Sequence, residues 1–133
     1  MSELIYPGTC ILLPKPRQDI KHLWVVLTKP EGEPAQVVIV NLTTRRQGSD
    51  TTVVLKPGDH RFIRQETVVN FSDARFAPVG PLEKISELVG YEFDDDCSDE
   101  LLQRIREGLL HSPFTPKNIL AYCKSRFTGL ASD

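Results

Sequence analysis

Apolar residues recur in short runs through the first eighty positions of the chain, and turn-forming residues separate the runs. Two runs, at residues 23–27 and 37–40, are continuously apolar, which is typical of strands covered on both faces. They are too short for helices, and the second is rich in β-branched residues. The pattern predicts strands at residues 9–13, 22–28, 36–42, 51–55 and 67–71, with a short one at 76–79.

Clusters of proline, glycine and small polar residues lie between these segments, at residues 14–16, 29–34, 47–50 and 57–58. Proline fixes the backbone angle φ and glycine supplies positive φ, so both residues favour turns. Five or six short strands at this spacing are typical of a small barrel rather than an open sheet. The first part of the chain is therefore expected to form a β-barrel.

After position 80 the pattern changes to helical. Pro81 introduces a predicted helix at residues 82–89, and Ser98 is placed to cap a second helix, which Pro113 ends. A third helix is predicted to start after Pro116. The later helices are amphipathic, so they are expected to pack on the barrel, on each other or on a partner.

This change of pattern gives two predicted domains: a β-barrel domain over residues 1–80 and a helical C-terminal extension over residues 81–133. The first domain carries ten Lys and Arg residues against eight Asp and Glu, whereas the second carries six against ten.

Three cysteines that lie far apart in the sequence predict neither a disulfide framework nor a zinc site. Without a signal peptide or an apolar run of about 18 residues, we expect a cytoplasmic protein and no membrane partner.

No motif for metal binding or nucleophilic catalysis is present in the sequence. The three histidines, His22, His60 and His111, lie in different segments and lack the spacing of paired ligands. The acidic run at residues 94–96 lacks the alternating spacing and central glycine of a calcium loop. No metal and no cofactor are therefore expected.

Polar residues instead gather after three of the predicted strands and turns. They are Thr43, Thr44, Arg45 and Arg46 after the third strand, Asp59, His60 and Arg61 after a proline-glycine turn, and Ser72, Asp73 and Arg75 after the fifth strand. If these loops converge, they supply the base, acid and cation that cleavage of RNA through its 2′-hydroxyl requires. The alternative is that they are ordinary surface charges and turn residues.

Three segments, at residues 21–28, 37–44 and 67–75, resemble the strand order of the MazF/PemK (Kid) toxins. Those toxins carry a corresponding R-P-x-L-V-L-S, a strand ending in Thr or Ser, and a later S-V-V…D-Q-x-R-T. The resemblance covers about residues 7–80. It implies an SH3-like barrel, usually homodimeric, that cleaves single-stranded RNA without a metal. It also implies neutralisation by an antitoxin whose flexible tail occupies the RNA groove.

By this resemblance Arg75 matches the catalytic arginine and Thr44 (or Thr43) the strand-end Thr or Ser. Arg75 is expected to stabilise the phosphorane, Thr44 to bind phosphate or ribose, and His60 or Asp73 to act as acid or base. The expected RNA-binding residues are Thr43, Arg45, Arg46 and Arg61.

The chain departs from the family pattern at several positions, namely Lys21, His22, Ser72 and Phe76. The acidic pI of about 5.9 and the additional helices favour an alternative. This is a non-catalytic barrel of the same fold that acts as a protein- or nucleic-acid-binding module. Trp24 is expected to be a core residue rather than a base-stacking platform.

Overall fold

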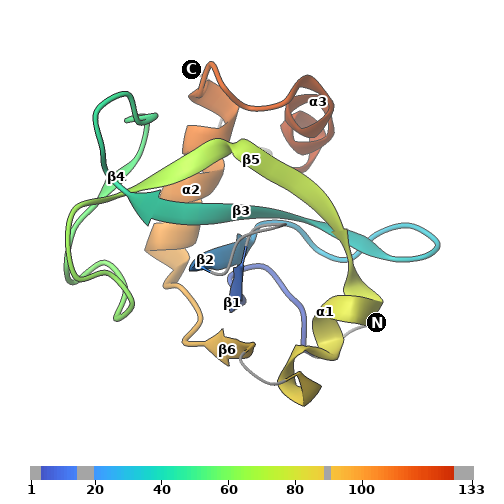
Figure 1. Cartoon of the computed structure of the whole chain (residues 1–133). Coiled ribbons are helices and arrows are strands. Elements are labelled where there is room, and N and C mark those ends of the chain that lie inside the picture. Colours follow the sequence, from blue (N-terminus) through green and yellow to red (C-terminus); the bar gives the residue numbers. More distant parts are fainter. Residues whose placement is uncertain (1–3, 15–19, 89–90, 128–133) are drawn as a thin grey trace.

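The computed structural model describes residues 4–14, 20–88 and 91–127. Within them, six antiparallel strands form one sheet in the order β4-β5-β3-β2-β1-β6, and the sheet curls into a half-barrel (Figure 1). The mainly β fold with C-terminal helices that the sequence predicts is confirmed. The strands are β1 Cys10–Pro14, β2 Lys21–Val26, β3 Gln36–Thr44, β4 Val54–Leu55, β5 Thr67–Pro78 and β6 Glu92–Asp94.

Strands β2 and β3 occupy the middle of the sheet, and their continuous apolar runs are buried on both faces as expected. Val25 and Val40 belong to a hydrophobic cluster on one face. Trp24 and Ile39 belong to a second cluster on the other face, so Trp24 is a core residue. Alternate side chains of a strand point to opposite faces, which explains why neighbouring residues enter different clusters.

Strand β5 corrects the sequence prediction of two strands, 67–71 and 76–79, joined by a polar turn. It is one strand of twelve residues that pairs with β3 on both sides of an irregularity between Ile39 and Asn41. At this bulge-like register shift, residues 71–74 of β5 lie opposite the single residue Val40 of β3, so the pairing is interrupted there and resumes beyond it. Ser72 and Asp73 therefore remain in the strand instead of turning the chain.

The other differences concern short elements. The strand predicted at 51–55 is reduced to β4, the two residues Val54 and Leu55. Strand β6 pairs with β1 and was not predicted, because three residues containing two acidic ones carry little β signal. The helix predicted at 82–89 begins earlier, as α1 Val79–Glu83, and continues as the 3₁₀ helix η1 Ile85–Glu87; residues 89 and 90 lie outside the described residues.

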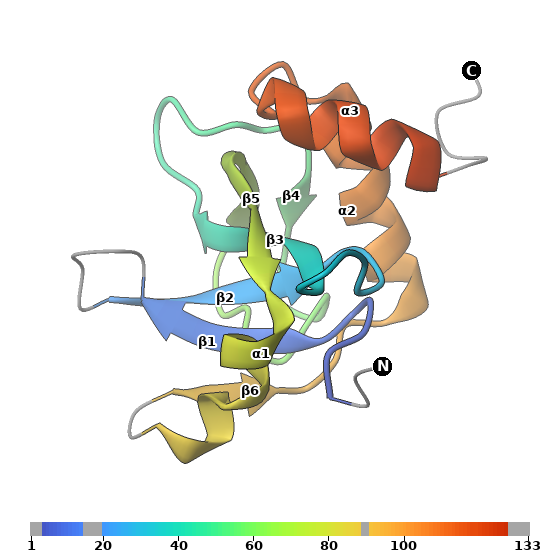
Figure 2. The same cartoon turned by 90° about the vertical axis from the view of Figure 1, so that its right-hand side faces the viewer.

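Helices α2 Asp99–His111 and α3 Lys117–Arg126 form where the sequence predicts them. The Ser98 hydroxyl accepts a hydrogen bond from the backbone N–H of Leu101 at 3.1 Å, the expected cap of α2. In both views α3 lies at one end of the molecule, and β6 lies with α1 at the other (Figures 1 and 2). None of the helices in the described ranges has the length and apolar composition needed to cross a membrane.

Apolar side chains of α2 and α3 complete the cluster on one face of the sheet. Ile105 and Leu109 of α2, with Ile119 of α3, share this cluster with Val40 and Phe71. Arg106 adds a polar link, since its Nε and Nη2 atoms both donate hydrogen bonds to the carbonyl oxygen of Leu27. The helices and the strands therefore bury a common core.

The contact between α2 and the sheet is closest at Gly108. An added Cβ at this position would meet Val53 Cγ2 and would lie 2.8 Å from Phe71 Cζ. We expect Gly108→Ala to lower the free energy of unfolding by about 1–3 kcal/mol, since both neighbours are core side chains that cannot move away freely.

Gly80 is the matched control, because nothing lies within 4 Å of an added Cβ there. Gly80→Ala in α1 is expected to leave stability unchanged or to raise it by up to about 1 kcal/mol through helix propensity. Urea unfolding followed by circular dichroism measures both variants. Equal stability of the two would contradict the close packing at Gly108.

Candidate functional site

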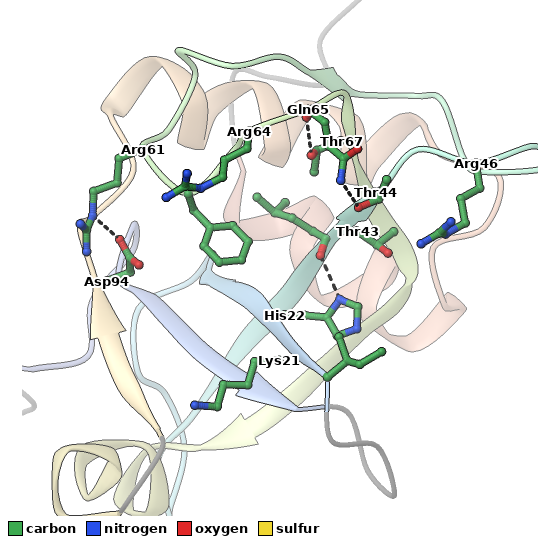
Figure 3. A pocket seen from close by; sticks show the side chains of 13 residues that line it. Lys21, His22, Thr43, Thr44, Arg46, Arg61, Arg64, Gln65, Thr67 and Asp94 are labelled. Atoms are coloured by element: carbon green, nitrogen blue, oxygen red, sulfur yellow. Dashed lines mark hydrogen bonds and ion pairs between the residues drawn. The ribbon is translucent and has the colours of Figure 1, made fainter.

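A groove with a volume of about 680 Å³ opens where β2 begins and β3 ends (Figure 3). Because these strands are antiparallel, the start of one lies beside the end of the other. The segment between β4 and β5 forms the opposite wall. We call this hollow the cationic groove; its lining residues are Ile20, Lys21, His22, Leu42, Thr43, Thr44, Arg46, Arg61, Phe62, Arg64, Gln65, Thr67 and Asp94.

Four cationic side chains and a single carboxylate, that of Asp94, line the groove. Arg61 is held by that carboxylate, with Nε 2.7 Å from Asp94 Oδ1, and the hydrogen bond raises the pKa of Arg61. Lys21, Arg46 and Arg64 form no ion pair with any residue that the structure describes. The groove is therefore electropositive in a protein whose net charge is −2.

Neutral polar groups and one aromatic ring complete the lining. The Gln65 amide lies 3.4 Å from the Thr44 hydroxyl, which it can donate to, and Phe62 contributes a half-buried ring. The His22 Nδ1 atom donates to the carbonyl oxygen of Leu42 at 3.3 Å, so the neutral ring keeps Nε2 as an acceptor. These groups can bind hydroxyls, amides and ring faces beside a bound anion.

His60, which was predicted as an acid or base, is buried and connects two backbone segments in the structure. Its side chain is 7% exposed and does not line the groove. Nδ1 accepts a hydrogen bond from the N–H of Phe62 at 3.0 Å, and Nε2 donates to the carbonyl oxygen of Asp95 at 2.6 Å. His60 thus joins the wall segment 61–64 to the end of β6, and both ring nitrogens are occupied.

The structure brings four of the predicted residues to the groove: Thr43, Thr44, Arg46 and Arg61. Arg45, predicted with them, lies outside this lining and pairs with Glu66 at 2.7 Å on the neighbouring surface. The backbone N–H of Arg45 also donates to the carbonyl oxygen of Glu66, which joins the chain after β3 to the segment before β5.

Arg75 lies away from this groove, and its expected convergence with Thr44 and His60 is not formed. Arg75 is opposite Ile39 on β3 whereas Thr44 is opposite Thr67, so five positions, a span of roughly 16 Å, separate the two pairs. The cause is the continuous strand β5: residues 72–75 do not form a turn and cannot return to the end of the half-barrel.

Arg75 belongs instead to a polar group at the β-bulge, which we call the bulge cluster: Asn41, Asn70, Ser72, Asp73 and Arg75. Asp73 Oδ2 accepts from the side-chain amides of Asn41 at 2.8 Å and Asn70 at 3.1 Å. The Arg75 Nη2 atom lies 3.7 Å from Asp73 Oδ1, and its guanidinium is 5.2 Å from the centre of the Trp24 ring. Asn41 Oδ1 is buried and has no hydrogen-bond partner among the described residues.

Sequence reasoning missed several groove residues, above all Lys21, Arg64 and Gln65. Lys21 directly precedes the strand predicted at 22–28, and antiparallel pairing of that strand with the one predicted at 36–42 would have placed Lys21 near Thr43 and Thr44. Arg64 and Gln65 lie just before β5, and only the fold of their segment brings them to the groove. In the described part of the chain, no group of three or more His, Cys, Asp or Glu is placed to hold a metal ion.

The structural role of His60 gives a stability prediction. His60→Ala leaves the Phe62 N–H and the Asp95 carbonyl oxygen without their partners, so we expect a loss of about 1–3 kcal/mol in the free energy of unfolding. The control is His111→Ala, an exposed histidine in the last turn of α2, for which the loss should stay below about 1 kcal/mol. Urea unfolding measures both; a His60→Ala variant as stable as the native protein would show that the ring does not hold this wall.

The chain was also compared with protein-family models, with curated proteins and with solved structures. No family model matches it, and neither a curated protein nor a solved structure does.

Proposed function

We propose that the protein is a nucleic-acid-binding module that holds single-stranded RNA in the cationic groove. The observation that supports this most directly is the set of cations around the hollow. Lys21, Arg46 and Arg64 have no acidic partner among the described residues and face a common space. Arginine binds phosphate oxygens through two parallel hydrogen bonds, and lysine binds them as a point charge.

The neutral lining accounts for the choice of single-stranded RNA. Thr43, Thr44 and Gln65 offer hydroxyl and amide groups that can bind a ribose 2′-hydroxyl or the edge of a base. Phe62 offers part of an aromatic face, and bases stack on such faces only when they are unpaired. A charged track with adjacent ring faces is the usual composition of a single-strand binding site.

RNA cleavage is the second candidate function, and the bulge cluster is the observation that favours it. There a carboxylate and a guanidinium lie side by side, and the Arg75 side chain is 43% exposed. Asp73 could accept the 2′-hydroxyl proton while Arg75 neutralises the charge that develops on the phosphorane. The resemblance to the MazF/PemK toxins extends this candidate to an SH3-like barrel, a homodimer and an antitoxin partner. In that case the antitoxin tail would occupy the cationic groove.

The binding proposal is tested with a double variant, Arg46→Ala/Arg64→Ala. We expect its affinity for a fluorescent 12-nucleotide RNA, measured by anisotropy, to fall at least tenfold at low salt, because two phosphate contacts are lost. The slope of log K against log salt concentration should become shallower by about 1.4, since each phosphate contact on a single strand contributes about 0.7.

Lys117→Ala/Lys124→Ala removes the same charge from exposed positions on α3 and is the matched control. Its affinity and its salt slope are expected to match those of the native protein. If both double variants weaken binding equally, the interaction depends on overall charge and not on the groove.

Cleavage is tested separately with Arg75→Ala. If the protein is a metal-independent endoribonuclease, the native chain should produce fragments ending in 2′,3′-cyclic phosphate with or without EDTA, and Arg75→Ala should abolish them. RNA binding by this variant is expected to persist, because Arg75 does not line the cationic groove. RNA that stays intact with the native protein removes the enzyme and leaves the binding module.

A further inference from the structure

A second groove, with a volume of about 430 Å³, adjoins the cationic groove. The linings of the two grooves share Thr43 and Arg46, so the grooves lie next to each other on the surface. Asn70 and Ser72 of β5 line the second groove, and Phe114 lines it from the connection between α2 and α3. Its surroundings are mostly uncharged, whereas the cationic groove is strongly positive.

Phe114 is an unusual residue for this place, because its side chain is large, apolar and 57% exposed. A single exposed apolar residue needs no explanation by itself. The backbone of Phe114, however, is connected through hydrogen bonds to Asp50, another residue that lines the second groove. The backbone N–H of Phe114 donates to Ser112 Oγ at 3.1 Å, and Ser112 Oγ donates to Asp50 Oδ2 at 2.7 Å.

The connection around Phe114 is fixed on both sides. Thr115 Oγ1 donates to the carbonyl oxygen of Leu109 at 2.8 Å, which ties the segment after Phe114 to α2. Asp50 is held as well, because its Oδ1 atom accepts from the N–H of Thr52 at 2.9 Å and from the Thr52 hydroxyl at 2.6 Å. The backbone that carries the ring is therefore pre-positioned, which lowers the entropy lost when a ligand binds.

We propose that Phe114 is a base-stacking platform at the end of an RNA path that starts in the cationic groove. The inference rests on the proposed function and adds a second subsite to it. Arg46 at the junction binds the phosphate between the subsites, and the next base stacks on the Phe114 ring. Thr43, Asn70 and Ser72 supply neutral donors and acceptors for the ribose and the base edge.

The test varies both the ring and the length of the RNA. Stacking of one base on an aromatic side chain changes affinity by roughly 5- to 100-fold. Phe114→Ala and Phe114→Leu should therefore weaken binding of a 12-nucleotide RNA by this factor. Binding of a four-nucleotide RNA, chosen so that the cationic groove supplies most of its contacts, should not change. Phe114→Trp should bind as the native protein does, and stacking should quench its added fluorescence, because the only native tryptophan, Trp24, is buried.

Leu88→Ala is the control, since Leu88 is also apolar and exposed but does not line either groove. Each base of the 12-nucleotide RNA is then replaced in turn by an abasic nucleotide. At the position whose base stacks on the ring, Phe114→Ala should no longer lower the affinity. If Phe114→Leu binds the long RNA as well as the native protein, the ring does not stack. If Phe114→Ala acts equally on both RNAs, no second subsite exists, and the Arg46→Ala/Arg64→Ala variant tests the cationic groove independently. A native protein that binds neither RNA overturns both proposals.

Discussion

Strand β3 must be buried on both faces, and most of the structure follows from that requirement. Its valine and isoleucine residues alternate between two hydrophobic clusters, so one layer of covering elements is needed on each side. Helices α2 and α3 cover one face, and α1 with η1 contributes to the other. Its buried stretch ends on one side at the exposed Gln36 and on the other at the partly exposed Thr43 and Thr44. The cationic groove begins at these two threonines.

Much of this arrangement could be predicted from local sequence signals. The continuous apolar runs indicated central strands, Ser98 indicated the start of α2, and Pro113 its end. Each of these signals depends on neighbouring residues. Strand β5 instead pairs with β3 over a long separation in sequence, and within this pairing the Asn41 side chain donates to Asp73 from 32 positions away. A polar stretch that reads as a turn can therefore remain a strand when a partner across the sheet satisfies it.

In the candidate site too, residues placed by local signals could be predicted, whereas residues placed by long-range strand pairing could not. Thr43, Thr44, Arg46 and Arg61 could be assigned to one groove because they follow predicted strands or turns. Arg75 could not be placed, since its position depends on the register of β5 against β3 and on the bulge. The surroundings of His60 could not be predicted either, because sequence alone does not show that Phe62 and Asp95 occupy both ring nitrogens. Chemically suitable residue types predict a site only after the pairing of the strands is known.

The hydrogen bond between Ser112 and Asp50 joins the helical part of the chain to the loop beside the groove. A proteolytic cut near residue 112 would therefore affect the sheet as well as the C-terminal helix. It would free the loop that precedes β4 from its anchor and expose the apolar side of the sheet that α3 helps to cover. Helices α2 and α3 are therefore an integral layer of the half-barrel, and a chain shortened before them would lack one side of its core.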